Sequence, residues 1–178
     1  MRFHRLLAGA TATALLTLGF PSLAAADDSD DSTVTLQVEG GALEISVKDG
    51  STSLGTVRSS AEGTTVSGRL GQVVVTDERN APAGSGWVAS VESTDFQPRR
   101  GSAISASKIS YLAGPIEKDG TATVTGKDPR NLRRSKAVVT ATNIEGNNTA
   151  SWYPTIEVDI PPGLVAGEYA ATITHSVM

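Results

Sequence analysis

The chain has 178 residues, with 15 basic and 19 acidic side chains and no cysteine. The lack of cysteine excludes disulfides, a thiol nucleophile, a cysteine-ligated zinc site and a lipidated N-terminal cysteine. A net charge of −4 argues against a general nucleic-acid binder, because such proteins carry a basic surface.

Residues 1–26 have the three-part pattern of a secretory signal peptide. Arg2 and Arg5 precede an uncharged stretch that ends in small residues suited to a signal peptidase. We predict export with cleavage after Ala26, which leaves about 150 residues, the length of one domain. The alternative is a membrane anchor, since residues 6–26 are uncharged and long enough to span a bilayer. Their content of alanine, glycine and threonine favours the signal peptide, so we expect no transmembrane segment in the mature chain.

Residues 27–32, DDSDDS, contain no apolar side chain. Such a segment cannot bury enough surface to offset its ordering entropy, so we predict a disordered acidic leader. A calcium site built from its aspartates is the alternative, but the glycine and the distal glutamate of an EF-hand loop are missing. The remaining residues, 33–178, are predicted to form a single domain.

From Thr33 onward, apolar and polar residues alternate with the period of two that is typical of strands. The runs 34–38 and 43–47, joined by two glycines, predict a hairpin. No apolar stripe of helical spacing occurs, so we predict an all-β fold, an antiparallel β-sandwich that is Ig-like in general architecture. Further strands are expected at residues 54–57, 64–67, 70–76, 87–93, 103–112, 121–125, 136–142, 154–160 and 168–177.

The segment Val73–Phe96, VVVTDERNAPAGSGWVASVESTDF, combines an apolar run ending in Asp77-x-Arg79 with a glycine turn and then Trp87. This pattern resembles the first signature of the bacterial WxL domain, a cell-wall-binding surface module in which V-x-D-x-R is followed by GW-x-L-x-V. The third motif position is Ala89 in this chain. The resemblance implies wall binding and companion proteins on the envelope.

The end of the chain resembles the second half of the same family. Residues 156–161 match an I-x-V-x-IP strand, and residues 166–174 match AG-x-Y-x-A-x-x-T. The family normally closes with a second Trp-x-Leu motif, whereas the corresponding residues here are His175-Ser176-Val177. Both Trp-x-Leu motifs therefore depart from the family pattern.

Strand parity places both tryptophans on apolar faces. Trp87 shares its face with Ala89 and Val91, and Trp152 shares its face with Ile156. A core role is one interpretation, since an indole buries a large apolar area. The alternative is an exposed ring that stacks on the sugars of a wall polymer.

Asp77 and Arg79 project to the same face at the end of a predicted strand. They can form an ion pair that fixes the turn at residues 80–86. Alternatively, Arg79 can hold a carboxylate or phosphate of a wall polymer with both arms of its guanidinium group.

Residues 127–136, KDPRNLRRSK, hold five basic side chains against one aspartate in an otherwise acidic chain. We expect this segment to attract an anionic wall polymer or the carboxylates of peptidoglycan, with marked salt dependence. A solvated loop that serves solubility is the alternative. Nucleic acid fits poorly, because no aromatic side chain is interleaved to stack a base. The predicted binding residues are Asp77, Arg79, Trp87, Arg130, Arg133, Arg134, Lys136 and Trp152.

The sequence contains few candidate catalytic groups. After cleavage the only histidine is His175, whose strand carries no metal partner two or four residues away. Glu157 and Asp159 share a strand face and would be the pair of a glycoside hydrolase, but neighbours at this spacing are common in any strand. We therefore expect no enzymatic activity, no catalytic residue, no metal and no cofactor.

These observations favour a secreted, non-enzymatic surface module, extracellular or associated with the cell wall. It would bind wall polymer or a partner surface protein without a covalent bond. A second hypothesis is a structural subunit or adhesin building block whose last strand, residues 168–178, pairs with another chain.

Overall fold

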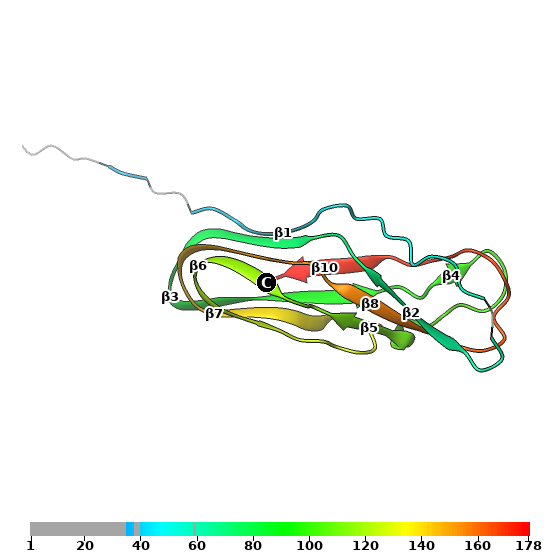
Figure 1. Cartoon of the computed structure of the whole chain (residues 1–178). Coiled ribbons are helices and arrows are strands. Elements are labelled where there is room, and N and C mark those ends of the chain that lie inside the picture. Colours follow the sequence, from blue (N-terminus) through cyan, green and yellow to red (C-terminus); the bar gives the residue numbers. More distant parts are fainter. Residues whose placement is uncertain (1–34, 38–39, 59) are drawn as a thin grey trace, which may run out of the picture. The chain divides into compact units, whose positions relative to one another are not determined.

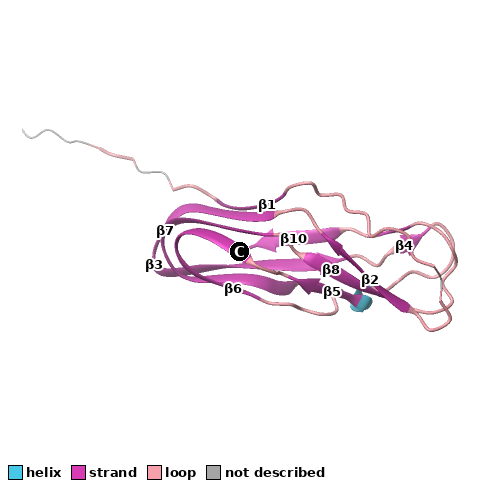
Figure 2. Cartoon of the chain, viewed as in Figure 1, coloured by secondary structure: helices cyan, strands magenta, loops and turns pink. Residues whose placement is uncertain are grey.

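The computed structural model describes residues 35–37, 40–58 and 60–178. The predicted signal peptide and acidic leader lie outside the described residues. The chain divides after Gln37, and every strand belongs to the unit Val38–Met178. Figure 2 shows strands along most of this unit and one short helical turn, η1 (Ala106–Lys108). The prediction of an all-β fold with antiparallel sheets packed against each other is confirmed.

The larger of the two main sheets has the strand order β1-β3-β7-β6 (Figure 1), and β10 also pairs with β3. A smaller sheet has the order β2-β8-β5, and β4 pairs with β9. All pairs are antiparallel. The strands are β1 (Leu43–Val47), β2 (Thr64–Arg69), β3 (Val73–Ser93), β4 (Gln97–Pro98), β5 (Ile109–Leu112), β6 (Ile116–Gly126), β7 (Lys136–Trp152), β8 (Thr155–Ile160), β9 (Tyr169–Ala170) and β10 (Ile173–Val177).

The long strands of the larger sheet fold back on themselves. Trp87 of β3 pairs with Ala141 of β7, and Asp77 pairs with Asn148, seven residues farther along β7. Seven residues of straight strand span about 23 Å, yet the indole nitrogen of Trp87 lies 3.0 Å from the side-chain oxygen of Asn148. The ribbon of β3 and β7 must therefore bend between these pairs. Figure 1 shows the strands turning back at the end of the domain drawn at the left.

We call this region the bend and define it as residues 77–87 of β3, 119–121 of β6 and 142–148 of β7. The pairing register shifts there in all three strands. Positive backbone φ angles occur at Asn80, Gly84, Gly120, Asn143 and Gly146. Such residues form β-bulges, which let one sheet turn a corner and supply strands to two packed layers.

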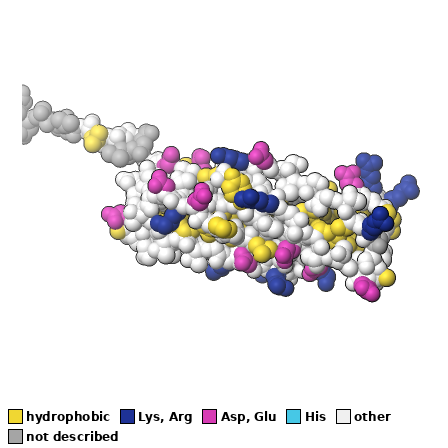
Figure 3. Space-filling model, in the orientation of Figure 1, with side chains coloured by type: hydrophobic (Ala, Val, Ile, Leu, Met, Phe, Trp, Pro, Cys, Tyr) yellow, Lys and Arg dark blue, Asp and Glu magenta, His cyan; other side chains and the backbone are white. Residues whose placement is uncertain are grey.

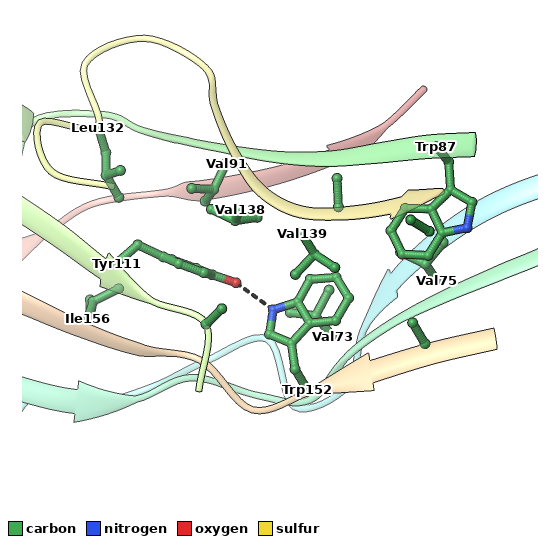
Figure 4. Packing of buried hydrophobic residues seen from close by; sticks show 14 of the residues in the cluster. Val73, Val75, Trp87, Val91, Tyr111, Leu132, Val138, Val139, Trp152 and Ile156 are labelled. Carbon is green, nitrogen blue, oxygen red and sulfur yellow. Dashed lines mark hydrogen bonds between the residues drawn. The ribbon is translucent and has the colours of Figure 1, made fainter. Parts of the chain in front are cut away.

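The core lies between the layers that the bend creates. On the first arm of the ribbon, Val73 and Val75 are fully buried, and Val73 pairs with Trp152. On the second arm, Trp87 and Val139 are buried. Figure 4 shows the two indoles well apart in this core, with Trp152 beside Val73 and Val139.

Several strand predictions differ from the structure. The segment 54–57 forms no strand, and neither do residues 35–37, the described part of the run 34–38. The partner of β1 is β3 rather than a preceding strand. Residues 103–108 do not continue β5, because the carboxylate of Asp95 accepts the backbone N–H of Ala106 and turns the chain into η1.

Residues 77–86 were predicted as a strand end followed by a turn, but they remain in the sheet as the bulged part of β3. The last predicted strand is interrupted at residues 171–172, between β9 and β10. Both differences arise where the chain changes its pairing partner, which local alternation does not encode.

Candidate functional site

Asp77, Arg79, Trp87 and Asn148 form one hydrogen-bonded cluster inside the bend. The Nε and Nη2 atoms of Arg79 donate to the two carboxylate oxygens of Asp77 at 2.8 and 2.9 Å. Asn148 donates its amide to Asp77 at 3.3 Å and accepts the Trp87 indole N–H at 3.0 Å. The ion pair predicted from the spacing of Asp77 and Arg79 is therefore present.

The cluster connects the two arms of the ribbon. Asp77 and Asn148 lie on the first arm and Trp87 begins the second, so the bond between Trp87 and Asn148 crosses the fold. Arg79 makes the same crossing, since its Nη2 atom donates to the Gly86 carbonyl at 3.3 Å. The D-x-R and G-W elements of the sequence pattern thus act together to hold the corner of the sheet.

The charges of the cluster are satisfied within it. Asp77 is fully buried, whereas 38% of the Arg79 side chain is exposed. The hydrogen bonds from Arg79 lower the pKa of Asp77 below its ordinary value and outweigh the opposite effect of burial. The same pair raises the pKa of Arg79. A polymer phosphate would therefore compete with an existing bidentate partner for Arg79.

Trp87 has 2% of its surface exposed. It belongs to the core, as the first of the two interpretations predicted, and its ring is not available for stacking on a sugar. Asn148, the residue that joins Trp87 to Asp77, was not identified from the sequence. Its position in a polar Gly146-Asn147-Asn148 stretch is typical of an exposed turn, and only the long-range pairing with Asp77 buries it.

Trp152 belongs to a second buried chain of hydrogen bonds, away from the bend. Its indole N–H donates to the hydroxyl oxygen of Tyr111 at 2.8 Å, as Figure 4 shows. That hydroxyl lies 3.1 Å from Nε2 of His175 on β10. Because the indole only donates, the Tyr111 hydroxyl keeps its own proton, which it can donate to Nε2 when the imidazole proton is on Nδ1.

Burial keeps this chain uncharged. Desolvation lowers the pKa of His175 to about 4 and raises the pKa of Tyr111. The Nδ1 atom of His175 is buried and has no hydrogen-bond partner among the described residues. A histidine that stays neutral and is held at Nε2 suits a structural role better than proton transfer near neutral pH.

Arg130, Arg133 and Arg134 lie on the connection between β6 and β7, and Lys136 is the first residue of β7. We call residues 127–136 the basic loop. Its charged side chains are all exposed. Among the described residues none of them has an acidic group within ion-pair distance, since the pair of Asp77 and Arg79 accounts for the salt bridges found.

The basic loop is held firmly by its backbone. Leu132 is fully buried, and its N–H and C=O bond to Ala106 and Ser93 at 3.0 and 2.8 Å. The carboxylate of Asp128 accepts the backbone N–H of Ala113 at 2.9 Å. The loop therefore presents its cations from a fixed frame rather than from a loose chain.

The fold adds a further cation to this surface. Asn131 donates its backbone N–H to Ile109, and Leu132 bonds to Ala106, so the basic loop lies against η1. The exposed Lys108 of η1 is thereby brought beside it. No local pattern in the sequence predicts this neighbour, because residues 108 and 131 meet only through the tertiary structure.

The predicted binding residues do not form one site. Lys136 precedes Ala141, the partner of Trp87, by five residues, which is about 17 Å of strand. The bend and the basic loop are thus separated, and Trp152 is buried with 1% of its surface exposed. Of the predicted residues, Arg79 and the four basic residues of the basic loop reach solvent, and Arg79 is already paired with Asp77.

No constellation of catalytic groups is found among the described residues. Glu157 and Asp159 lie on β8, and Asp159 accepts a hydrogen bond from Thr65 at 2.8 Å. Neither carboxylate lines the cavity beside Val47 and His175 or the pocket between Gln97 and Glu168. The described residues also contain no group of three or more histidine, aspartate or glutamate side chains placed to hold a metal ion.

We expect acrylamide to quench the fluorescence of both tryptophans only weakly, because each indole is covered by the core. N-acetyltryptophanamide measured in parallel provides the value for a free indole. Quenching of the folded protein close to that of the free indole would contradict the placement of Trp87 and Trp152.

Comparison of the chain with family models, with curated proteins and with solved structures found no match. The described part of the chain contains no helix with the length and apolar character needed to cross a membrane.

Proposed function

We propose that this protein is an exported, non-enzymatic surface module, WxL-like in character, that binds an anionic cell-wall polymer through its basic loop. The observation that carries the proposal is the loop itself: five exposed cations without ion-pair partners among the described residues, on a backbone fixed by a buried leucine and main-chain hydrogen bonds. A rigid loop loses little conformational freedom when it binds, which favours affinity.

The chemistry of the loop suits a repeating anion. Arg130, Arg133 and Arg134 can each bond a phosphate or carboxylate with two N–H groups, whereas Lys136 and Lys108 act as point charges. The face drawn in Figure 3 mixes both signs of charge and carries a further group of Lys and Arg side chains at its right-hand end. The basic loop holds five cations against one aspartate in an acidic chain. The attraction acts between solvent-exposed charges, so it weakens as the salt concentration rises.

The resemblance to the WxL pattern supports export and envelope association but not the same contact residues. In this chain Asp77, Arg79 and Trp87 stabilise the bend. The proposed contact therefore shifts from the motif to the basic loop.

Strand pairing with another chain is a weaker candidate. β10 pairs with β3 from Ile173 to Val177, and Met178 exchanges two backbone hydrogen bonds with Val88. Donation of the last strand to a partner would require the loss of all these bonds, whereas the basic loop can bind without any rearrangement.

The direct test is sedimentation of the mature protein with purified cell walls at low and at high ionic strength. Replacing Arg130, Arg133, Arg134 and Lys136 by alanine is expected to weaken binding by about tenfold or more, since each exposed ion pair contributes roughly 0.2–1 kcal/mol. High salt is expected to release the unmodified protein.

A matched control removes the same charge elsewhere. Arg58, Arg99, Arg100 and Lys118 are exposed and lie outside the basic loop, so their replacement by alanine should leave most of the binding intact. An equal loss of wall binding in both variants would show that net charge, rather than the basic loop, causes the binding. Absence of wall binding by the unmodified protein at low ionic strength would refute the proposal.

A further inference from the structure

A cavity of about 280 Å³ lies beneath the connection between β1 and β2. Its walls come from that connection, from the end of β1, from the two residues after β2, from Phe96, from β8, and from β10 with the two residues before it. The lining contains no charged side chain. Its apolar surface is supplied by Val47, Leu54, Leu70, Phe96, Ile156 and Ile173.

Two glycines allow the connection between β1 and β2 to lie close over the cavity. A Cβ atom on Gly71 would overlap the carbonyl oxygen of Lys48, and one on Gly68 would overlap the side chain of Leu54. Lys48 also donates its N–H to Gln72 at 2.8 Å. Lys48 therefore packs against Gly71, and Leu54 packs against Gly68, because neither glycine has a side chain to block the approach. The chain between Lys48 and Leu54 covers the cavity.

The polar groups of the cavity are few and neutral. His175 lines it, and its ring is held by Tyr111. The other polar side chains of the lining are the hydroxyl groups of Thr52 and Thr172. Burying a charged group in such surroundings without a partner is strongly unfavourable, so the lining selects against charged ligands.

The volume is large enough for a small molecule, since a cavity of about 150 Å³ holds benzene. The cavity is partly open to solvent, which gives a ligand access. Apolar side chains together with a few convergent neutral polar groups are usual in the lining of small-molecule sites.

We propose that this cavity binds a small neutral molecule with an apolar body of two or three aromatic rings. The site shares no residue with the basic loop, so the two activities are independent.

The test uses N-phenyl-1-naphthylamine, a neutral fluorescent probe, titrated with the full mature protein. We expect saturable binding at one site, with enhanced and blue-shifted emission. The anionic analogue 8-anilinonaphthalene-1-sulfonate should bind at least tenfold more weakly, because the lining offers no counter-charge. Absence of saturable binding, or tighter binding of the anionic probe, would overturn the proposal.

Variants that fill the cavity locate the site. Ala171→Leu enlarges a side chain of the lining and is expected to lower the affinity for the neutral probe at least tenfold. Gly50→Leu adds a side chain at an exposed position of the lining, where a Cβ meets no atom within 4 Å, and is expected to have a smaller effect. Ala83→Leu, at an exposed position of the bend, should leave the affinity unchanged. Unchanged affinity in an Ala171→Leu variant that is folded, as shown by a cooperative thermal transition, would place the probe elsewhere and overturn the proposal.

Discussion

Replacing Arg79 by alanine is expected to lower the free energy of unfolding by about 3 kcal/mol, because the change leaves the carboxylate of Asp77 buried without a counter-charge. The figure is at the lower end for a buried pair, since the guanidinium group is partly exposed. Arg79 also donates to the Gly86 carbonyl across the bend. In a domain of this size the loss corresponds to a fall in Tm of about 6–12 °C.

Urea unfolding of the unmodified protein and of the Arg79→Ala variant measures this effect, with Arg99→Ala as the matched control. Arg99 is exposed and has no ion-pair partner among the described residues, so its loss should change stability by less than about 0.5 kcal/mol. An Arg79→Ala variant as stable as the control would show that the ion pair does not hold the bend.

The same pair predicts how stability depends on acid. The folded-state pKa of Asp77 lies below its ordinary value of 3.8, so its contribution is present above pH 3.8 and is lost as the pH falls through the folded pKa. Without the Arg79 side chain, the effect of burial, which raises the pKa of Asp77, is opposed only by the hydrogen bonds from Asn148 and from the backbone N–H of residue 79. The stability difference between the two proteins should therefore shrink in strong acid.

The second large effect is a loss of stability between pH 6.5 and pH 4 that originates at His175. Burial lowers the folded-state pKa to about 4 from the ordinary 6.5, so in this window the unfolded chain binds a proton that the folded chain does not. The contribution is fully present above pH 6.5 and falls as the pH drops toward 4, by up to about 3 kcal/mol.

Urea unfolding at a series of pH values between 7 and 4 tests this prediction, because Asp77 titrates below that range. Phenylalanine at position 175 fills a similar volume and cannot be protonated, so His175→Phe should remove most of the pH dependence even if its stability at pH 7 is lower. Persistence of the full slope in this variant would assign the titration to another group.

The two arms of the ribbon were predictable from the sequence, but the bend between them was not. Alternation identified residues 70–76, 87–93 and 136–142 as strands, and parity placed both tryptophans on apolar faces. The stretch between Asp77 and Trp87 contains Asn80 and several glycine and proline residues, which are typical of a turn. Its bulged pairing with β7 depends on residues about 60 positions away.

For the candidate binding residues too, local sequence predicts some features, and tertiary contacts determine the others. The exposure of Arg130 and its neighbours follows from local charge, whereas the anchoring of the loop by Leu132 and the approach of Lys108 depend on bonds to η1 and β3. Tyr111 shows the same limit. Its strand was predicted, but its position between Trp152 and His175 joins three strands whose arrangement local sequence does not specify.

The continuity of β3, β6 and β7 through the bend also fixes how the strands can align. In a sandwich of separate sheets, one strand can slip by two residues without disturbing the opposite layer. Here a slip of β7 against β3 would displace side chains in both layers at once and would pull Asn148 away from Trp87. The folded ribbon thus protects the domain against misregistered pairing, and changes in chain length are best tolerated in the connections far from the corner.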